Sequence, residues 1–186
     1  VTSTNNKGFA MLYGVAESGV LREGPKLLTH FYPKYGTAGS SAVEVYASAK
    51  VDGELVLAKN YGCSSSCEGG KSGNGITEND LGHWMTIVIH AKYATIANND
   101  GVYEIWKTNW QGITEKIVDI HDGPWYSTRE DGSPARGFDQ GYLLGWANAG
   151  FTEETVFYID NFTLSTTPLV ADYTSAPKPP LLFSSN

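Results

Sequence analysis

Short segments in which apolar and polar residues alternate recur along most of this chain, and they constrain its fold more than any other feature. A period of two is typical of β-strands that bury one face, and these segments are rich in the Val, Ile, Tyr, Thr and Trp that favour strands. Turn sequences such as "VDGE" and "NNDG" separate them. The predicted strands cover residues 25–36, 41–51, 54–62, 83–93, 101–108, 115–121, 141–149 and 155–165.

Helical patterning is nearly missing from the sequence. No segment has a 3.6-residue apolar period over three turns, and only "TENDLGHW" is expected to form one helical turn, led by Thr77 with Asp80 three residues on. The sequence therefore predicts an all-β protein, an antiparallel β-sandwich of the jelly-roll type. We expect residues 1–168 to form this domain and the Pro-rich residues 169–186 to form a strap or tail.

The charge of the chain excludes some partners. The sequence has 13 Lys and Arg against 20 Asp and Glu, which gives a formal net charge of −7. Nucleic acids and anionic membranes are not expected as partners, because both bind basic surfaces. No apolar run approaches the ~20 residues of a membrane span. An acidic substrate would require a local basic cleft.

Two cysteines, Cys63 and Cys67, lie in the Ser- and Gly-rich stretch "YGCSSSCEGGKSGNG". Their spacing favours a small disulfide-closed loop and an oxidising compartment, with a pair of free thiols as the alternative. The chain begins "VTSTNNKGF", as a processed protein would. We therefore expect a secreted protein, and we expect it to be a monomer.

Alternation also predicts which polar side chains point away from the core. Aromatic, His and Lys residues gather on these outward faces: His30, Tyr32, Lys34, Tyr46, Trp84, His90, Lys92 and Trp106. Aromatic rings are costly to leave in bare solvent, so we favour a ligand-binding concave sheet over an ordinary solvated face. This interpretation groups His30, Tyr32, Tyr46 and His90 on one sheet face.

Two long stretches, "HWMTIVIHAKYATIANNDGVYEIWKTN" and "GYLLGWANAGFTEETVFYIDNFTLS", carry a family resemblance. They combine a strand that opens in Trp, an Asn/Asp-Gly turn, a strand with Trp near its end, and a closing strand with "IDN". The chain resembles the concanavalin-like, lectin-like jelly rolls of polysaccharide lyases, of the alginate- and glucuronan-lyase types. "NKGFAMLYG", "GPKLLTHFYPKYG" and "VEVYAS" occupy the places of the early Gly-rich loop and the concave-face strands, and "LLTHFY" stands where several such lyases carry an Arg-bearing strand.

The resemblance implies cleavage of a uronate-containing polysaccharide by β-elimination. Such a lyase neutralises the uronate carboxylate, removes the neighbouring carbon-bound proton and protonates the leaving oxygen. Tyr46 is the preferred proton-transfer residue, and His30 or Lys34 would neutralise the carboxylate. The candidate catalytic set is Tyr46, His30, Tyr32, His90 and Lys34. The candidate substrate-binding set is Trp84, Trp106, Lys92, Arg129, Trp146 and Asn148.

Other functions stay open at this stage. A non-catalytic carbohydrate-binding module or lectin needs only aromatic platforms and hydrogen-bonding groups. The candidates for that role are Trp84, Trp106, Trp110, Trp125, Trp146 and Asn148. A structural or adhesive sandwich is a third alternative. Glycoside hydrolysis is not expected, because no strand carries three acids at alternating positions and Glu44 is isolated on its strand.

Asp160 stands in mid-run of the last predicted strand, on a face shared with Tyr158 and Phe162. An unpaired carboxylate on an apolar face would be costly. Either backbone N–H groups satisfy it in a turn, or it helps to hold a structural calcium ion, which prefers hard oxygen ligands. Calcium is the one possible cofactor, and no organic cofactor is expected.

Overall fold

The computed structural model describes residues 7–14, 26–33, 41–51, 54–61, 74–95, 98–123, 125, 138–147, 158–167 and 169. Within these ranges the chain forms nine strands and one short 3-10 helix. In chain order they are β1 Lys7–Gly14, β2 Lys26–Pro33, β3 Ser41–Val51, β4 Glu54–Tyr61, β5 Asn74–Ile76, η1 Glu78–Asp80, β6 Thr86–Lys92, β7 Gly101–Thr108, β8 Thr114–Gly123 and β9 Phe138–Ala147. No helix in the described part is long and apolar enough to cross a membrane.

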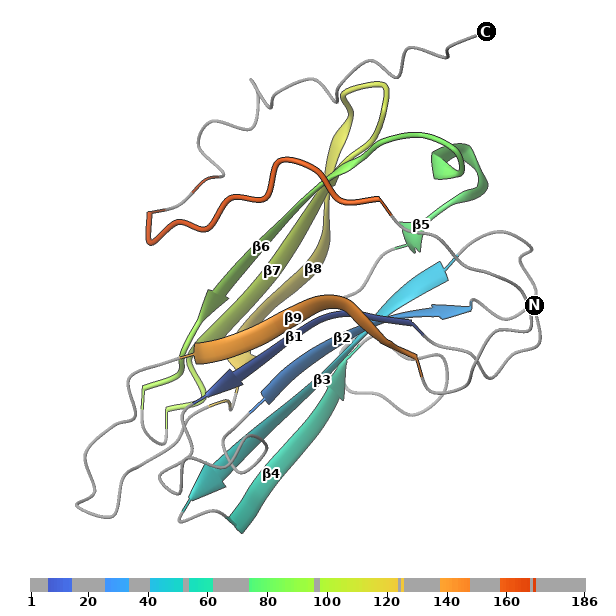
Figure 1. The fold of residues 1–186 in the computed structure, drawn as a ribbon. Coiled ribbons are helices and arrows are strands. Elements are labelled where there is room, and N and C mark those ends of the chain that lie inside the picture. The colour runs from blue at the N-terminus through green and yellow to red at the C-terminus, as the bar shows by residue number, and fades with distance from the viewer. Residues whose placement is uncertain are drawn as a thin grey trace, which may run out of the picture.

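The strands form two antiparallel sheets (Figure 1). The larger sheet has the order β4-β3-β2-β1-β9, with β5 paired to β3. The smaller sheet has the order β6-β7-β8. The prediction of an all-β, antiparallel protein is therefore confirmed for the described residues, and the single helical turn forms at η1, directly after Thr77.

The sequence did not predict two of the strands, β1 and β5. β1 contains two glycines in "KGFAMLYG", which weaken the strand signal. Pairing with β2 on one side and β9 on the other makes it a strand nonetheless. The register of both pairings shifts between Gly8 and Ala10, as expected where a strand glycine marks a bulge. β5 is only three residues long, and it depends on β3 for its hydrogen bonds.

The prediction of a last strand is wrong for residues 158–165, which form no strand. This irregular segment is coloured orange-red in Figure 1. Tyr158, Phe162 and Leu164 are exposed by 77%, 69% and 88%. Asn161 has a φ of 55°, in the left-handed region, which interrupts an extended backbone. Apolar alternation over this segment therefore does not produce burial.

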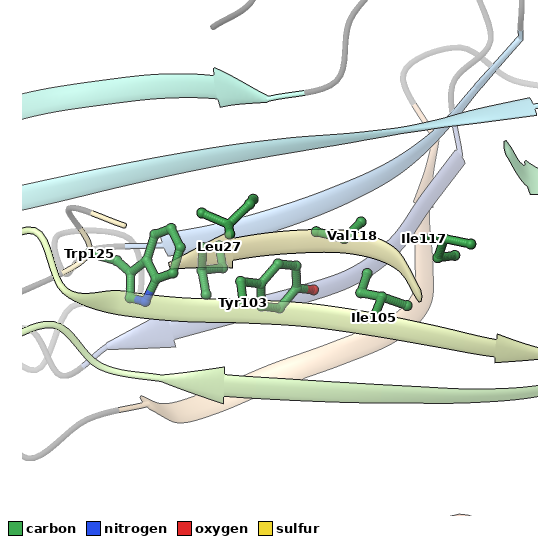
Figure 2. Packing of buried hydrophobic residues seen from close by; sticks show 7 residues of the cluster. Leu27, Tyr103, Ile105, Ile117, Val118 and Trp125 are labelled. Atoms are coloured by element: carbon green, nitrogen blue, oxygen red, sulfur yellow. The ribbon is translucent and has the colours of Figure 1, made fainter. Parts of the chain in front are cut away.

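Both sheets contribute to one apolar core (Figure 2). Its buried members are Leu27, Tyr103, Ile105, Ile117, Val118, Ile120 and Trp125, with Leu12, Ile87, Ile89, Ala91, Tyr93 and Phe138 packed against them. The predicted inward positions Leu27 and Thr29 on β2, and Tyr103 and Ile105 on β7, are confirmed as buried. The alternate positions of these strands therefore form the outer faces of the two sheets.

A hydrogen bond joins the sheets inside this core. The hydroxyl oxygens of Thr29 on β2 and Tyr103 on β7 lie 2.5 Å apart, and both residues are fully buried. Burial raises the pKa of Tyr103 to about 12, against the opposite effect of the Thr29 hydrogen bond. The phenol therefore stays protonated, and the two hydroxyls share one hydrogen bond.

Trp125 closes the core against two glycines. Its indole N–H donates to the carbonyl of Lys92 over 2.7 Å, and its ring packs on Gly101 and Gly123. A Cβ atom at Gly101 would lie 2.6 Å from the indole nitrogen, and one at Gly123 would overlap the ring. These glycines leave the space that the indole fills, so Trp125 has a structural role and the interpretation of Trp125 as a sugar platform is wrong.

Lys107 is a buried cation at the far end of β7. Its ammonium lies 3.0 Å from Asp80 and 2.9 Å from Glu115. Asp80 also accepts hydrogen bonds from the backbone N–H and the hydroxyl of Thr77, each over 2.8 Å. Burial alone would raise the pKa of Asp80, but the bonds from Thr77 and Lys107 outweigh it and hold that pKa below its usual value. This network ties η1 to the smaller sheet.

The hydrogen bond between the sheets is tested by a double-mutant cycle. We expect Thr29→Val to lower the free energy of unfolding by about 1–3 kcal/mol, because it leaves the Tyr103 hydroxyl buried without a partner. Tyr103→Phe in the same chain removes that orphaned group, so the double variant should lose less than the sum of the two single losses. Urea unfolding of the four proteins measures the coupling, and strictly additive losses would contradict it.

Lys107 binds two carboxylates that differ in burial, so substitutions of Asp80 and Glu115 form a matched pair of variants. The Asp80 side chain is 4% exposed and that of Glu115 is 54% exposed. We expect Asp80→Ala to cost about 3 kcal/mol of stability, because it leaves the buried ammonium of Lys107 without its buried partner and removes the bonds to Thr77. Glu115→Ala should cost less than about 1 kcal/mol, as exposed ion pairs do. Equal losses in thermal or urea unfolding would show that burial does not control this network.

Candidate functional site

The strand register brings several predicted site residues together on the outer face of the larger sheet, the face opposite to Leu27 and Thr29. His30 of β2 pairs with Glu44 of β3. Tyr46 pairs with Leu28 on one side and with Asn60 of β4 on the other. His30, Glu44, Tyr46 and Asn60 thus take neighbouring positions on three adjacent strands, and we call them the β2–β4 row.

Spacing within the β2–β4 row follows from sheet geometry. Residues directly opposite each other have Cβ atoms about 5 Å apart, and diagonal neighbours are about 7–8 Å apart. His30 and Tyr46 are such a diagonal pair, because their partners Glu44 and Leu28 stand two residues away on the facing strands. Both positions therefore lie within reach of a single sugar unit.

Trp146 extends this face on the other side of β1. Gly8 pairs with His30 of β2 and also with Trp146 of β9, so these two positions flank a residue without a side chain. Tyr32 takes the same face as His30, opposite Ala42. The prediction that His30, Tyr32 and Tyr46 share one face is confirmed at the level of register.

His90 does not belong to this face, and the predicted grouping of His90 with His30 is wrong. β2 lies in the larger sheet and β6 in the smaller one. Ile87 and Ile89 of β6 pack against the core, so His90 takes the outer face of the smaller sheet. Trp84, Lys92 and Trp106 also come from the smaller sheet or the segment leading into it. The sequence cannot show this, because a period of two assigns a face within each strand but does not assign strands to sheets.

The outer face of the smaller sheet carries a group of charged side chains, which we call the polar cluster. It consists of His90 of β6, Glu104 of β7, and Lys116, Asp119 and His121 of β8. Glu104 is at its centre and is the most buried member, with a side chain only 10% exposed. The register opposes Glu104 to His90 and to Asp119, which explains why the five groups meet.

Every charge in the polar cluster has a partner. Glu104 lies 2.8 Å from Nδ1 of His90, 2.7 Å from Nζ of Lys116 and 3.2 Å from Nε2 of His121. Asp119 lies 3.1 Å from Lys116 and 2.9 Å from His121. The cluster is therefore a network on the sheet surface whose members bind one another.

The directions in which the pKa values of Glu104 and Lys116 are shifted agree with this pairing. Burial raises the pKa of Glu104, but hydrogen bonds from His90 and Lys116 outweigh it and hold that pKa below its usual value. The bond to Glu104, followed by that to Asp119, raises the pKa of Lys116. Both groups are therefore held in their charged forms, which favours a structural role over proton transfer.

Trp84 and Trp106, the predicted substrate-binding tryptophans of the smaller sheet and the segment leading into it, are partly covered. Lys116 places its ammonium 4.9 Å from the ring centroid of Trp106, a cation–π contact. The indole nitrogen of Trp84 is buried and has no hydrogen-bond partner among the described residues. Lys92 lies 3.6 Å from Asp100. Trp106 therefore offers less open ring surface than its place on an outer face suggested.

A metal ion could bind at the polar cluster, where the ligand atoms of Glu104, Asp119 and His121 all lie within 4.8 Å of one another. The ammonium of Lys116 already binds both carboxylates, so a metal would compete with it. Calcium takes about six to eight oxygen ligands. Two carboxylates and one imidazole suit a transition metal better.

Asp160, the predicted calcium ligand, lies elsewhere and is exposed. Its carboxylate accepts a hydrogen bond from the backbone N–H of Asn161 over 2.8 Å. This bond matches the turn-bonding alternative that the sequence left open. Among the described residues, Asp160 belongs to no group of metal-ligating side chains. The calcium ion stays a prediction.

Some predicted sites lie outside the described residues. They are Lys34, Arg129, Asn148, and the cysteines Cys63 and Cys67, together with the tail from 170 onwards. Conversely, the register adds Asn60 to the site, and it gives Glu44 the neighbour His30. Their strands showed period-two patterning, but no local signal pairs β3 with β4 at Asn60.

The calcium prediction is tested by thermal unfolding. If Asp160 helps to hold calcium, the ion should raise the Tm of the wild type by about 5–10 °C at about one hundred times its Kd. Asp160→Ala should have a lower Tm and no calcium response, while Glu115→Ala, a change to another exposed acid outside both candidate metal sites, should keep the response. An unchanged wild-type Tm in chelator would leave only the hydrogen bond to Asn161.

No family model matches the chain, and no curated protein or solved structure matches it either. The resemblance to polysaccharide lyases therefore rests on sequence patterns alone. What the site can do follows from the arrangement of its own residues.

Proposed function

We propose that the chain is a jelly-roll sandwich that binds an acidic, uronate-containing polysaccharide on the outer face of the larger sheet and cleaves it by β-elimination. The observation that carries this proposal is the β2–β4 row, in which the register makes His30, Glu44, Tyr46 and Asn60 neighbours. A phenol, an imidazole, a carboxylate and an amide in one patch include the groups that this reaction requires.

The reaction divides among these residues as follows. Asn60, with His30, binds the uronate carboxylate and lowers the cost of charge developing on it. Tyr46, as the phenolate, removes the proton from the carbon next to that carboxylate. The electron pair of the broken C–H bond forms a C=C bond, and the adjacent C–O bond to the next sugar breaks. The leaving oxygen takes a proton from the Tyr46 phenol, which restores the starting state.

Charge explains why His30 matters in this scheme. The chain has a net charge of −7, so an acidic polymer needs a local source of positive charge to approach it. On the outer face of the smaller sheet, the cations Lys116 and Lys92 are already paired with acids. His30 stands at the end of β2 that leads toward Lys34. This favours the larger sheet as the binding face, and we propose that a secreted monomer acts there.

A non-catalytic carbohydrate-binding domain is the second candidate function. Its supporting observation is Trp146, which shares the outer face with His30 across Gly8 and would supply an aromatic surface for a sugar. The two functions differ in one readout. Elimination creates an unsaturated sugar end that absorbs in the ultraviolet, whereas binding alone causes retention on a polysaccharide gel without a change in absorbance.

Tyr46→Phe is the decisive variant. We expect it to reduce the rate of ultraviolet product formation from alginate or polyglucuronate by about 10²–10⁴, because it removes the group that transfers the proton. Binding to the same polymer should change by less than about threefold, since only one hydroxyl is lost. The measurement combines absorbance kinetics with affinity electrophoresis.

Tyr158→Phe is the matched control, because Tyr158 is exposed and lies outside both sheets. It should leave the rate unchanged. Full activity in Tyr46→Phe would remove Tyr46 from the mechanism. Binding of uronate polymers by the wild type without any cleavage would establish the carbohydrate-binding function instead.

A further inference from the structure

The loop between β7 and β8 is held rigidly by its own hydrogen bonds. The side-chain oxygen of Asn109 accepts from the backbone N–H groups of Gln111 and Ile113, over 3.0 and 2.9 Å. The backbone of Asn109 also bonds to Gly112 and Ile113. Gly112 has a φ of 82°, which a residue with a side chain rarely adopts. The position of Trp110 within this loop is therefore well defined.

The Trp110 ring is fixed as well. It stacks on His83, with ring centroids 4.6 Å apart and planes inclined by 21°. Its indole N–H donates to the backbone carbonyl of Asn79 over 3.1 Å. Yet 47% of the residue remains exposed. His83 covers one side of the ring, so the exposed surface comes from the opposite side and the ring edges.

Apolar residues lie close in the chain to Trp110 and to its hydrogen-bond partner Asn79. Leu81 and Ile113 are exposed by 59% and 60%, and Asn79 and Gln111 supply exposed amide groups. We call Leu81, His83, Trp110 and Ile113 the hairpin platform. A stable protein interface buries about 800 Å² on each partner, or about 20–30 residues. Four side chains at a hairpin end are too few for that, whereas one indole face matches the size of one sugar ring.

We propose that Trp110 is a stacking surface for a pyranose ring of a polysaccharide, and that the hairpin platform is a second carbohydrate site. A pyranose presents C–H groups on one face and hydroxyls around its rim. The C–H groups would lie on the open indole face, and the hydroxyls would bond to Asn79 and Gln111. A ring already immobilised by His83 and Asn79 loses little conformational entropy on binding.

This site is distinct from the β2–β4 row, because its residues belong to the smaller sheet and its loops. It rests on the proposed function only for the class of polymer. Since the platform contains no Lys, Arg, Asp or Glu, it recognises the C–H face of the sugar rather than its carboxylate. It would hold the chain of a polymer whose uronate is processed on the larger sheet.

Affinity electrophoresis of the full chain in gels containing sodium alginate or sodium polyglucuronate tests the proposal. All variants carry Tyr46→Phe as well, so that the polymer stays intact during the run. We expect Trp110→Ala and Trp110→Leu to weaken binding about tenfold, and Trp110→Phe to keep affinity within about threefold. Leu164→Ala, which removes exposed apolar surface outside the platform, should change it by less than about twofold.

Each other outcome is decisive. Circular dichroism identifies variants that remain folded, and Trp110→Leu preserves an apolar side chain if Trp110→Ala does not fold. Unchanged binding in folded Trp110→Ala or Trp110→Leu overturns the proposal, as does an equal loss in Leu164→Ala or the lack of any retardation of the parent. If the wild type forms no ultraviolet product while binding depends on Trp110, the elimination reaction fails and the platform stands.

Discussion

The hydrogen bond between Thr29 and Tyr103 connects the two sheets inside the core, and it marks the face of each sheet that points inward. Leu27 beside Thr29, and Ile105 beside Tyr103, belong to the same apolar cluster. Once these inward positions are set, alternation sends His30 and Glu104 to opposite outer faces. A polar bond inside an apolar core also restricts how the sheets can slide, because a shift would leave two buried hydroxyls unpaired.

The two outer faces have different chemical characters for an electrostatic reason. On the smaller sheet, Glu104 is almost buried, and an isolated carboxylate there would be costly. His90, Lys116 and His121 surround it and bind it, so the ammonium of Lys116 is used within the protein. A face whose lysines are already paired with acids has little left for an acidic polymer. The larger sheet, with the β2–β4 row, is the better candidate for substrate chemistry.

The proposed carbohydrate sites divide recognition between charge and shape. The β2–β4 row combines groups that ionise or donate hydrogen bonds, as needed where a carboxylate is bound and a proton moves. The hairpin platform offers an aromatic surface, which suits a longer polymer because stacking tolerates changes in the substituents of a sugar. Trp106, under Lys116, and Trp125, in the core, show that an indole is available to a ligand only where tertiary packing leaves a ring face open.

The sequence by itself determined the secondary-structure class and the inward positions Leu27 and Thr29 of β2 and Tyr103 and Ile105 of β7, because alternation in an extended chain is a local property with a period of two. It also located the turn at Thr77 and Asp80. Only the tertiary structure decided that His30 and His90 lie in different sheets, that Asn60 stands next to Tyr46, and that Glu104 gathers two histidines and a lysine. Those facts depend on hydrogen bonds between strands far apart in the chain. For residues 158–165 the local pattern was misleading, since apolar alternation yields a buried strand only where a neighbouring strand pairs with it, and the left-handed Asn161 interrupts the extended backbone there.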